Sequence, residues 1–201
     1  MIDHAIAGLQ AGYPVVLPFD TVYGLAADPL REEPTRRLYE LKGRDQTEPS
    51  ALVARDLDQL LECLPELDGR AVSLARLLLP GPVTLVLPNP ARRFRWLTGT
   101  NPETIGVRVP DFAGPGANVL AQVGALVATS ANHPGAPDPK RLDEVSEDIR
   151  LGAAALVDGG ELPGSPSTVI DLSGAKPRIL RDGALPAEEA LRRLGAAVRS
   201  G

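Results

Sequence analysis

The sequence predicts a single α/β domain with a twisted, open, mixed sheet and helices packed on its faces. The chain has 201 residues, of which 43% are hydrophobic and 23% are charged, the proportions of a globular domain with a substantial core. Short apolar runs of strand length are interspersed with amphipathic stretches of helical period. Several strands follow one another without a helix between them, which is typical of a mixed sheet and not of a repeating βαβ barrel. We therefore treat residues 1–201 as one domain.

The expected elements follow in chain order from apolar runs, turn residues and capping signals. Strands are predicted over residues 15–17, 51–54, 83–87, 104–109, 126–129, 155–157, 168–172 and 178–180. Helices are predicted over residues 2–10, 33–42, 57–64, 68–78, 117–123, 138–149 and from 186 onward. Asp56, Asp68 and Asp138 precede three of these helices as N-caps, and Pro139 suits a first helical turn. Pro18 and Pro110 end the strands before them, because proline has no N–H to donate to a ladder.

Composition excludes several classes of function. The net charge of −5 argues against bulk electrostatic capture of nucleic acid or of an anionic membrane. A single cysteine, Cys63, excludes an intrachain disulfide, and His4 and His133 lack the spacing of a zinc site. Neither a P-loop nor a dinucleotide fingerprint occurs. With no secretory signal and no apolar run near the roughly 18 residues of a membrane span, we expect a cytoplasmic protein without a membrane partner.

Polar side chains follow many of the predicted apolar strands, at the edge where ligands bind in open α/β sheets. The clusters are Asp20-Thr21-Tyr23, Lys42-Gly43-Arg44, Thr104 with Arg108, Ser130-Ala131-Asn132, Ser167-Thr168 and Arg181. Cations that neutralise phosphate, beside hydroxyl and amide groups that fix orientation, favour an anionic nucleotide. Lys42 and Arg44 also follow a helix C-terminus, where cations are favourable without any ligand. Arg108 lies inside an apolar strand, where an arginine needs a partner or a ligand.

Seven segments occur in an order that resembles the YrdC-like family, which contains the threonylcarbamoyl-AMP synthases. They are Pro18-x-Asp20-Thr21-Val22-Tyr23-Gly24-Leu25, Lys42-Gly43-Arg44, Pro80-Gly81-Pro82-Val83-Thr84, Gly106-Val107-Arg108-Val109-Pro110, Ser130-Ala131-Asn132, Pro166-Ser167-Thr168-Val169 and Ile179-Leu180-Arg181-x-Gly183. The resemblance covers residues 2–185 and implies a YrdC-like fold. We expect no trace of the additional C-terminal domain that some members carry.

The resemblance implies a nucleotidyltransferase reaction. L-threonine, bicarbonate and ATP would give L-threonylcarbamoyladenylate and pyrophosphate, and the tRNA t6A transferase machinery would use the adenylate. By motif position the threonine site would be Thr21, Tyr23, Arg108 and Ser167, with Arg108 on the carboxylate. The ATP site would be Lys42, Arg44, Thr104, Ser130, Asn132 and Arg181, with Lys42 and Arg44 as the catalytic residues. Catalysis would consist mostly of positioning and charge neutralisation. Mg²⁺ would arrive with ATP, and no metal site built by the protein is expected.

Four positions depart from the usual family pattern. Phe19 stands in place of threonine, Asp45 in place of proline, Glu48 in place of an uncharged amide and Ser50 in place of an aliphatic residue. At about 7 Å and an effective dielectric constant of about 20, repulsion between one such carboxylate and a phosphate costs about 2 kcal/mol. The two carboxylates would point to solvent or pair with Lys42 and Arg44, or contact magnesium, or mark a member of reduced or changed activity. The alternative function is a catalytically altered paralogue that binds nucleotide or RNA.

Residues 92–96 interleave arginine with aromatic side chains, a composition that can stack on unpaired bases. The segment follows Pro88-Asn89-Pro90, and we expect a surface loop whose Phe94 and Trp96 turn back into the core. Aromatic side chains that turn into the core cannot stack on bases, and a net charge of −5 disfavours RNA. RNA binding is therefore only weakly supported.

Overall fold

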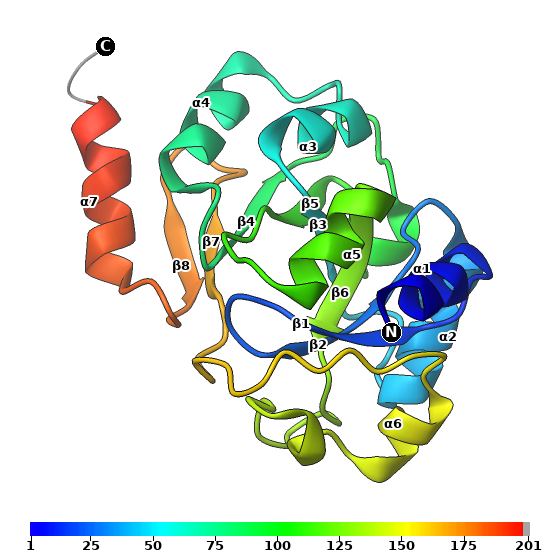
Figure 1. Ribbon diagram of the computed structural model, residues 1–201. Helices are drawn as coiled ribbons and strands as arrows, with labels where there is room; N and C mark the ends of the chain where they lie inside the picture. The colour runs from blue at the N-terminus through cyan, green and yellow to red at the C-terminus, as the bar shows by residue number, and fades with distance from the viewer. Residues whose placement is uncertain (199–201) are drawn as a thin grey trace.

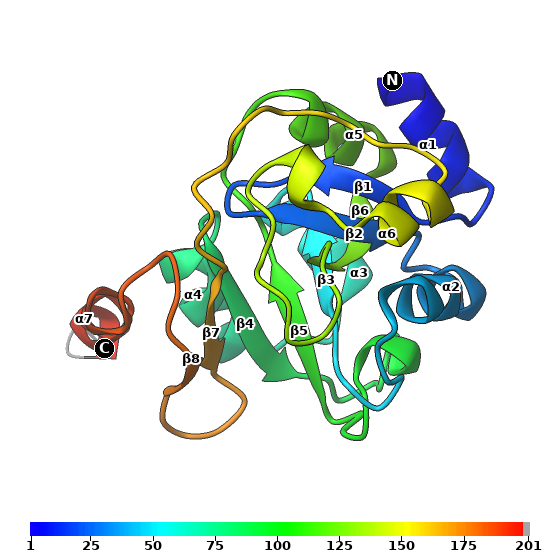
Figure 2. The ribbon, with the colours of Figure 1, turned by 90° about the horizontal axis from the view of Figure 1, so that it is seen from below.

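The computed structural model describes residues 1–198 and confirms the open mixed sheet with helices packed on it (Figure 1). The strands are β1 (Val15–Pro18), β2 (Tyr23–Ala27), β3 (Ala51–Ala54), β4 (Val83–Pro88), β5 (Thr104–Arg108), β6 (Ala125–Ser130), β7 (Thr168–Asp171) and β8 (Arg178–Arg181). They lie in the order β1-β2-β6-β3-β5-β4-β7-β8, which can be followed in Figure 2. The β3–β5 and β4–β7 pairs are parallel, and the other neighbours are antiparallel.

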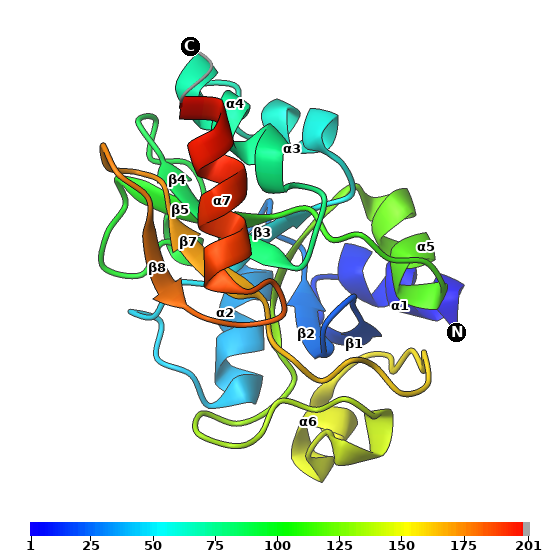
Figure 3. The ribbon, with the colours of Figure 1, turned by 90° about the vertical axis from the view of Figure 1, so that its left-hand side faces the viewer.

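The helices pack on the sheet in groups. They are α1 (Ile2–Gln10), α2 (Glu32–Lys42), α3 (Leu57–Cys63), α4 (Gly69–Leu78), α5 (Pro115–Val123), α6 (Glu147–Gly152) and α7 (Ala187–Val198), with 3-10 turns at Arg95–Leu97 and Leu142–Glu144. α1 and α5 pack on each other and on β1, α2 packs on β2, α3 on β3 and α4 on β4. α7 contacts α4 at the β8 end of the sheet, far from α1 (Figure 3). None of the helices in residues 1–198 is both long and apolar enough to cross a membrane.

Local sequence signals account for much of this architecture. The carboxylate of Asp56 accepts a hydrogen bond from the Gln59 backbone N–H at 2.7 Å, and Asp68 caps α4 in the same way. In β3, Leu52 enters the larger apolar cluster and Val53 enters the smaller one. Successive strand residues face opposite sides, so β3 is buried on both faces, as its short apolar run predicts.

Strand β2 was not predicted from the sequence. Residues 15–18 and 23–27 form an antiparallel hairpin, and its loop carries Asp20 and Thr21. The Phe19 N–H donates to the Val22 carbonyl oxygen across this loop at 3.4 Å. Gly24 and the two alanines that end β2 weaken its intrinsic strand signal, so pairing with β1 and β6 makes this segment a strand.

The predicted helix over residues 138–149 is wrong. The chain instead forms a 3-10 turn at Leu142–Glu144, an extended Val145 and then α6. Tertiary hydrogen bonds hold the preceding residues out of a helix, because the Pro139 carbonyl accepts from the Tyr23 N–H at 2.8 Å. The Glu144 side chain accepts from the Lys140 N–H at 2.8 Å. Asp138 is therefore not a helix cap, and it lines the cavity described below.

The predicted strand over residues 155–157 is reduced to a single bridge. Leu156 pairs in parallel with Val16 of β1. The Val16 N–H donates to the Ala155 carbonyl and the Val157 N–H donates to the Val16 carbonyl, at 2.9 and 3.0 Å. This segment therefore covers the outer edge of β1 without becoming a ninth strand of the sheet.

Candidate active site

A cavity of about 610 Å³ lies over the sheet, and strands β2 to β8 all contribute to its lining. Small residues of three adjacent strands, Ala51, Gly106 and Ala128, face this space. Of the predicted site residues, Thr21, Arg44, Thr104, Arg108, Ser130, Ser167 and Arg181 line the cavity, whereas Tyr23, Lys42 and Asn132 do not. The prediction that Arg44, Arg108 and Arg181 converge on one hollow is confirmed, although the three come from well-separated segments.

Arg108 has the partner that its position in a buried strand requires. Its Nη2 pairs with the Asp20 carboxylate and donates to the Thr21 hydroxyl at 2.8 Å. The two charged side chains are only 7% and 11% exposed. Burial raises the pKa of Asp20 against the opposing effect of the Arg108 charge, and burial lowers the pKa of Arg108. The β1–β2 loop therefore holds Arg108 in place by charge and hydrogen bonding.

The Arg181 guanidinium is fixed on the Ser167 backbone. Its Nε and Nη2 donate to the Ser167 carbonyl at 3.1 and 2.8 Å, and Nη2 also donates to the Ser167 hydroxyl at 3.2 Å. The Ser167 hydroxyl shares a 2.8 Å hydrogen bond with the Thr84 hydroxyl. Thr84 had no predicted role, although a hydroxyl in the apolar run of β4 was an available signal. Arg181, Ser167 and Thr84 thus form one connected polar wall.

Arg44 is held by neutral acceptors and by one carboxylate. Gly43 ends α2 in the left-handed conformation at φ 67°, after which the chain turns and brings Arg44 to the cavity. Arg44 Nη1 donates to the Thr129 hydroxyl at 2.9 Å and Nη2 to the Pro49 carbonyl at 2.7 Å. The Glu48 carboxylate lies 3.0 Å from Arg44 Nε.

Of the alternatives for the two unusual carboxylates, Glu48 pairs with Arg44, whereas Asp45 does not pair with either cation. Asp45 is exposed and accepts from the Thr47 N–H and hydroxyl at 2.8 and 2.7 Å, and the backbone hydrogen bond is the main reason that its pKa is lowered.

The sequence of the chain is similar to a known protein family. A sequence model of the Sua5/YciO/YrdC family, described as telomere recombination, matches residues 7–183. The chain belongs to this family. It is 37% identical over 182 residues to a threonylcarbamoyl-AMP synthase of Pyrococcus abyssi and 31% identical over 189 residues to that of Bacillus subtilis. These matches cover 90% and 94% of the chain but 53% and 55% of the relatives, so the chain spans about half of their length.

A solved structure gives the same result for the fold. The crystal structure of P. abyssi Sua5 complexed with L-threonine superposes with a TM-score of 0.85 at 37% identity, covering 96% of this chain and 57% of that one. The YrdC-like fold expected from the seven segments is therefore confirmed.

Lys42, a residue of the family motifs, lies behind the cavity lining. It is buried, and its Nζ donates to the Ser130 and Asn132 carbonyls, both at 2.6 Å, and to Asn132 Oδ1 at 2.9 Å. Burial lowers its pKa to about 8, and the Arg44 charge adds to this shift. Lys42 thus fixes the turn that presents Ser130 to the cavity.

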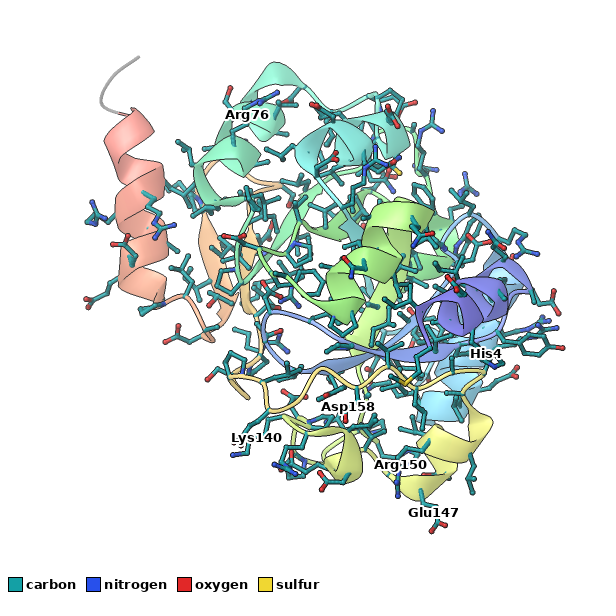
Figure 4. All side chains as sticks on the ribbon, in the orientation of Figure 1. His4, Arg76, Lys140, Glu147, Arg150 and Asp158 are labelled. Atoms are coloured by element: carbon teal, nitrogen blue, oxygen red, sulfur yellow. The ribbon has the colours of Figure 1, made fainter. Side chains whose placement is uncertain are left out.

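Tyr23 has a comparable structural position. Its hydroxyl donates to Gly160 O at 2.8 Å or to Asp158 Oδ1 at 2.9 Å, and it accepts from the Gly159 N–H at 2.9 Å. Asp158, labelled in Figure 4, lies on the segment between α6 and β7. Tyr23 therefore ties this long segment to the β1–β2 hairpin.

Phe19 and Ser50 both line the cavity at positions where the sequence departs from the family pattern. The Phe19 ring packs on Phe112, with centroids 5.8 Å apart, and covers Gly24 so closely that an added Cβ would lie 2.6 Å from it. Ser50 is 5% exposed, and its N–H donates to the Leu97 carbonyl at 2.9 Å. Phe19 therefore gives the cavity an apolar wall where threonine is usual.

The loop at residues 92–96 forms as expected. Arg92 pairs with Glu103, and Arg93 makes a two-nitrogen contact with the Glu66 carboxylate. Phe94 and Trp96 pack against the core, and the Trp96 indole N–H donates to a backbone carbonyl at 3.0 Å. The aromatic rings therefore do not stand free to stack on bases. Within the described residues, no cluster of three or more His, Cys, Asp or Glu side chains is placed to hold a metal ion.

Proposed function

We propose that this chain forms L-threonylcarbamoyladenylate and pyrophosphate from L-threonine, bicarbonate and ATP. The observation that carries the proposal is that three arginines of the family motifs, Arg44, Arg108 and Arg181, line one cavity of about 610 Å³. A cavity of this size, with a few polar groups directed into it, suits small-molecule substrates. Relatives of the chain are named threonylcarbamoyl-AMP synthases, which supports the same reaction.

The Arg108 end of the cavity suits the threonine carboxylate. Arginine has five N–H donors, and the contacts to Asp20 and Thr21 use only those of Nη2. The Thr21 hydroxyl accepts from Arg108, so its own hydrogen is left to donate to an anionic group. In our proposal Arg108 and Thr21 bind the carboxylate, and Ser167 contributes a second hydroxyl.

Two further arginines of the cavity suit the triphosphate. Arg44 and Arg181 would neutralise phosphate charge, while the hydroxyls of Thr104 and Ser130 would fix its orientation. Lys42 would act through the turn at residues 130–132 that it holds. Magnesium would enter with ATP as part of the substrate.

The chemical step needs no side-chain nucleophile. The threonine amine adds to bicarbonate with loss of water and gives a carbamate. A carbamate oxygen then attacks the α-phosphorus, the bond from that phosphorus to the bridging oxygen breaks, and pyrophosphate leaves. Negative charge develops on the phosphate oxygens, where fixed arginines stabilise it most. A tRNA t6A transferase would consume the adenylate.

The test is direct product analysis. The protein is incubated with Mg-ATP, L-threonine and bicarbonate, and pyrophosphate and the adenylate are quantified, with threonine omitted in a parallel reaction. We expect threonine-dependent pyrophosphate, strongly reduced at low threonine concentration in Arg108→Ala and retained in Arg93→Ala, whose arginine pairs with Glu66 outside the cavity lining. Pyrophosphate no higher than in the threonine-free reaction would contradict the proposal and favour a catalytically altered paralogue.

A further inference from the structure

Among the described residues, Arg44 is a cavity cation with only one charged partner within 4 Å. That partner is Glu48, in the same loop, and the two side chains are 17% and 56% exposed. Two neutral acceptors, the Thr129 hydroxyl and the Pro49 carbonyl, hold the other end of the Arg44 guanidinium. Arg44 is therefore fixed in position without help from Glu48.

The Glu48 carboxylate is close to Arg44 but loosely attached. It lies 3.0 Å from Arg44 Nε, yet that N–H makes no aligned hydrogen bond. The backbone of Glu48 is anchored, because its carbonyl accepts from the Tyr39 hydroxyl at 3.1 Å and its N–H donates to Asp45 at 3.1 Å. The loop and Arg44 are therefore held independently of the Glu48 carboxylate.

We propose that Glu48 is an internal counter-ion that sets the anion affinity of Arg44. Glu48 is not among the residues that line the cavity, so its carboxylate acts on the Arg44 guanidinium through its charge, 3.0 Å from Nε. This inference rests on the proposed function only in taking the cavity ligand to be a polyphosphate. Glu48 then lowers the affinity for every anion at Arg44, so that ligands of low charge are held weakly.

The test uses inorganic tripolyphosphate as the probe, in calorimetric titrations without magnesium at low salt. Glu48→Gln keeps the shape of the side chain and removes its charge, and we expect it to lower the Kd about three- to tenfold, the range for a partly exposed charge near a phosphate. Asp45→Asn is the matched control, because Asp45 is in the same loop and contacts Thr47 but not Arg44. It should change the Kd by less than about twofold, because Asp45 is exposed to water of high dielectric constant and is not in contact with Arg44.

A double-mutant cycle separates the ion pair from a general charge effect. In an Arg44→Gln background, Glu48→Gln should give less than about twofold tightening, and 0.5 M salt should reduce the gain seen in the wild-type background. The inference would be overturned if Glu48→Gln left the affinity for tripolyphosphate unchanged or lower, or if Asp45→Asn raised the affinity equally. It would also be overturned if Glu48→Gln raised the affinity equally without Arg44, or if no variant bound tripolyphosphate. Product formation does not enter these measurements, so the failure of the proposed reaction would be seen separately.

Discussion

Replacing Asp20 with asparagine should destabilise the protein by about 2–3 kcal/mol, because it leaves Arg108 buried without a counter-charge. The two side chains are 7% and 11% exposed. At a charge separation of about 4 Å and an effective dielectric constant of about 20, their attraction is about 4 kcal/mol. Part of that loss is offset, because the charged Asp20 carboxylate is costly to desolvate and asparagine carries no charge. The same desolvation cost raises the pKa of Asp20. The asparagine oxygen also still accepts from Arg108.

Urea unfolding followed by circular dichroism measures this cost, with similar m-values confirming a comparable transition. Glu66→Gln is the matched control, because it removes the carboxylate of an exposed arginine pair, with Arg93 and Glu66 44% and 36% exposed. Exposed pairs contribute little to stability, because water screens both charges. Equal destabilisation by Asp20→Asn and Glu66→Gln would refute the view that the loop of the β1–β2 hairpin holds Arg108 by charge.

Three further outcomes are expected. Arg108→Ala should raise the KM for threonine about tenfold or more, because a charge-assisted contact to the substrate is lost. The KM for ATP should change far less. Equal changes of the two KM values in initial-rate measurements would contradict the assignment of Arg108 to the threonine carboxylate. Gly183→Ala should lower the unfolding free energy by about 1–3 kcal/mol, because the added Cβ would lie 2.3 Å from a backbone carbonyl oxygen. Gly174→Ala is the control and should be neutral, because a Cβ there meets nothing within 4 Å. Equal unfolding midpoints for the two variants would count against this packing. His133 places one ring nitrogen on a backbone carbonyl and the other on the Asp148 carboxylate, so both must donate, and these contacts raise its pKa. The stabilisation from His133 should be complete below the unfolded pKa of about 6.5 and lost as pH rises through the higher folded value. The free energy of urea unfolding should therefore differ more between pH 6 and pH 8 in wild type than in His133→Ala. An identical difference in the two proteins would contradict this role of His133.

Local signals were sufficient where an element depends on its own residues. The run at Ala51–Ala54 is a strand with the predicted bounds, and Asp56 and Asp68 cap the predicted helices. Each of these depends on a side chain and a backbone group only a few residues apart. The helix boundaries after Asp56 and Asp68 could therefore be placed from the sequence.

Non-local contacts decided the elements that were missed. β2 begins at Tyr23 and includes Gly24, and it is a strand because β1 and β6 pair with its two edges. The stretch from Asp138 has helical capping signals, yet the Tyr23 N–H takes the Pro139 carbonyl from a segment far away in sequence. Neither partner could be identified from local propensity.

The site was predictable in composition but not in its internal pairing. The order of the polar segments along the chain, together with the family resemblance, predicted that Arg44, Arg108 and Arg181 meet, and they line one cavity. The direction of each side chain depends on the conformation of the loops. The hydrophobic periodicity of the sequence does not predict loop conformation. The pairing of Arg108 with Asp20 and the position of Lys42 behind the lining are therefore visible only in three dimensions.

A calorimetric titration of L-threonine, with and without a non-hydrolysable ATP analogue, tests most directly whether one cavity takes both substrates. We expect saturable threonine binding to the wild-type protein, an affinity that changes when the analogue is bound, and threonine binding at least about tenfold weaker in Arg108→Ala. Threonine binding that is unaffected by both the analogue and Arg108→Ala would contradict a shared site at the converging arginines.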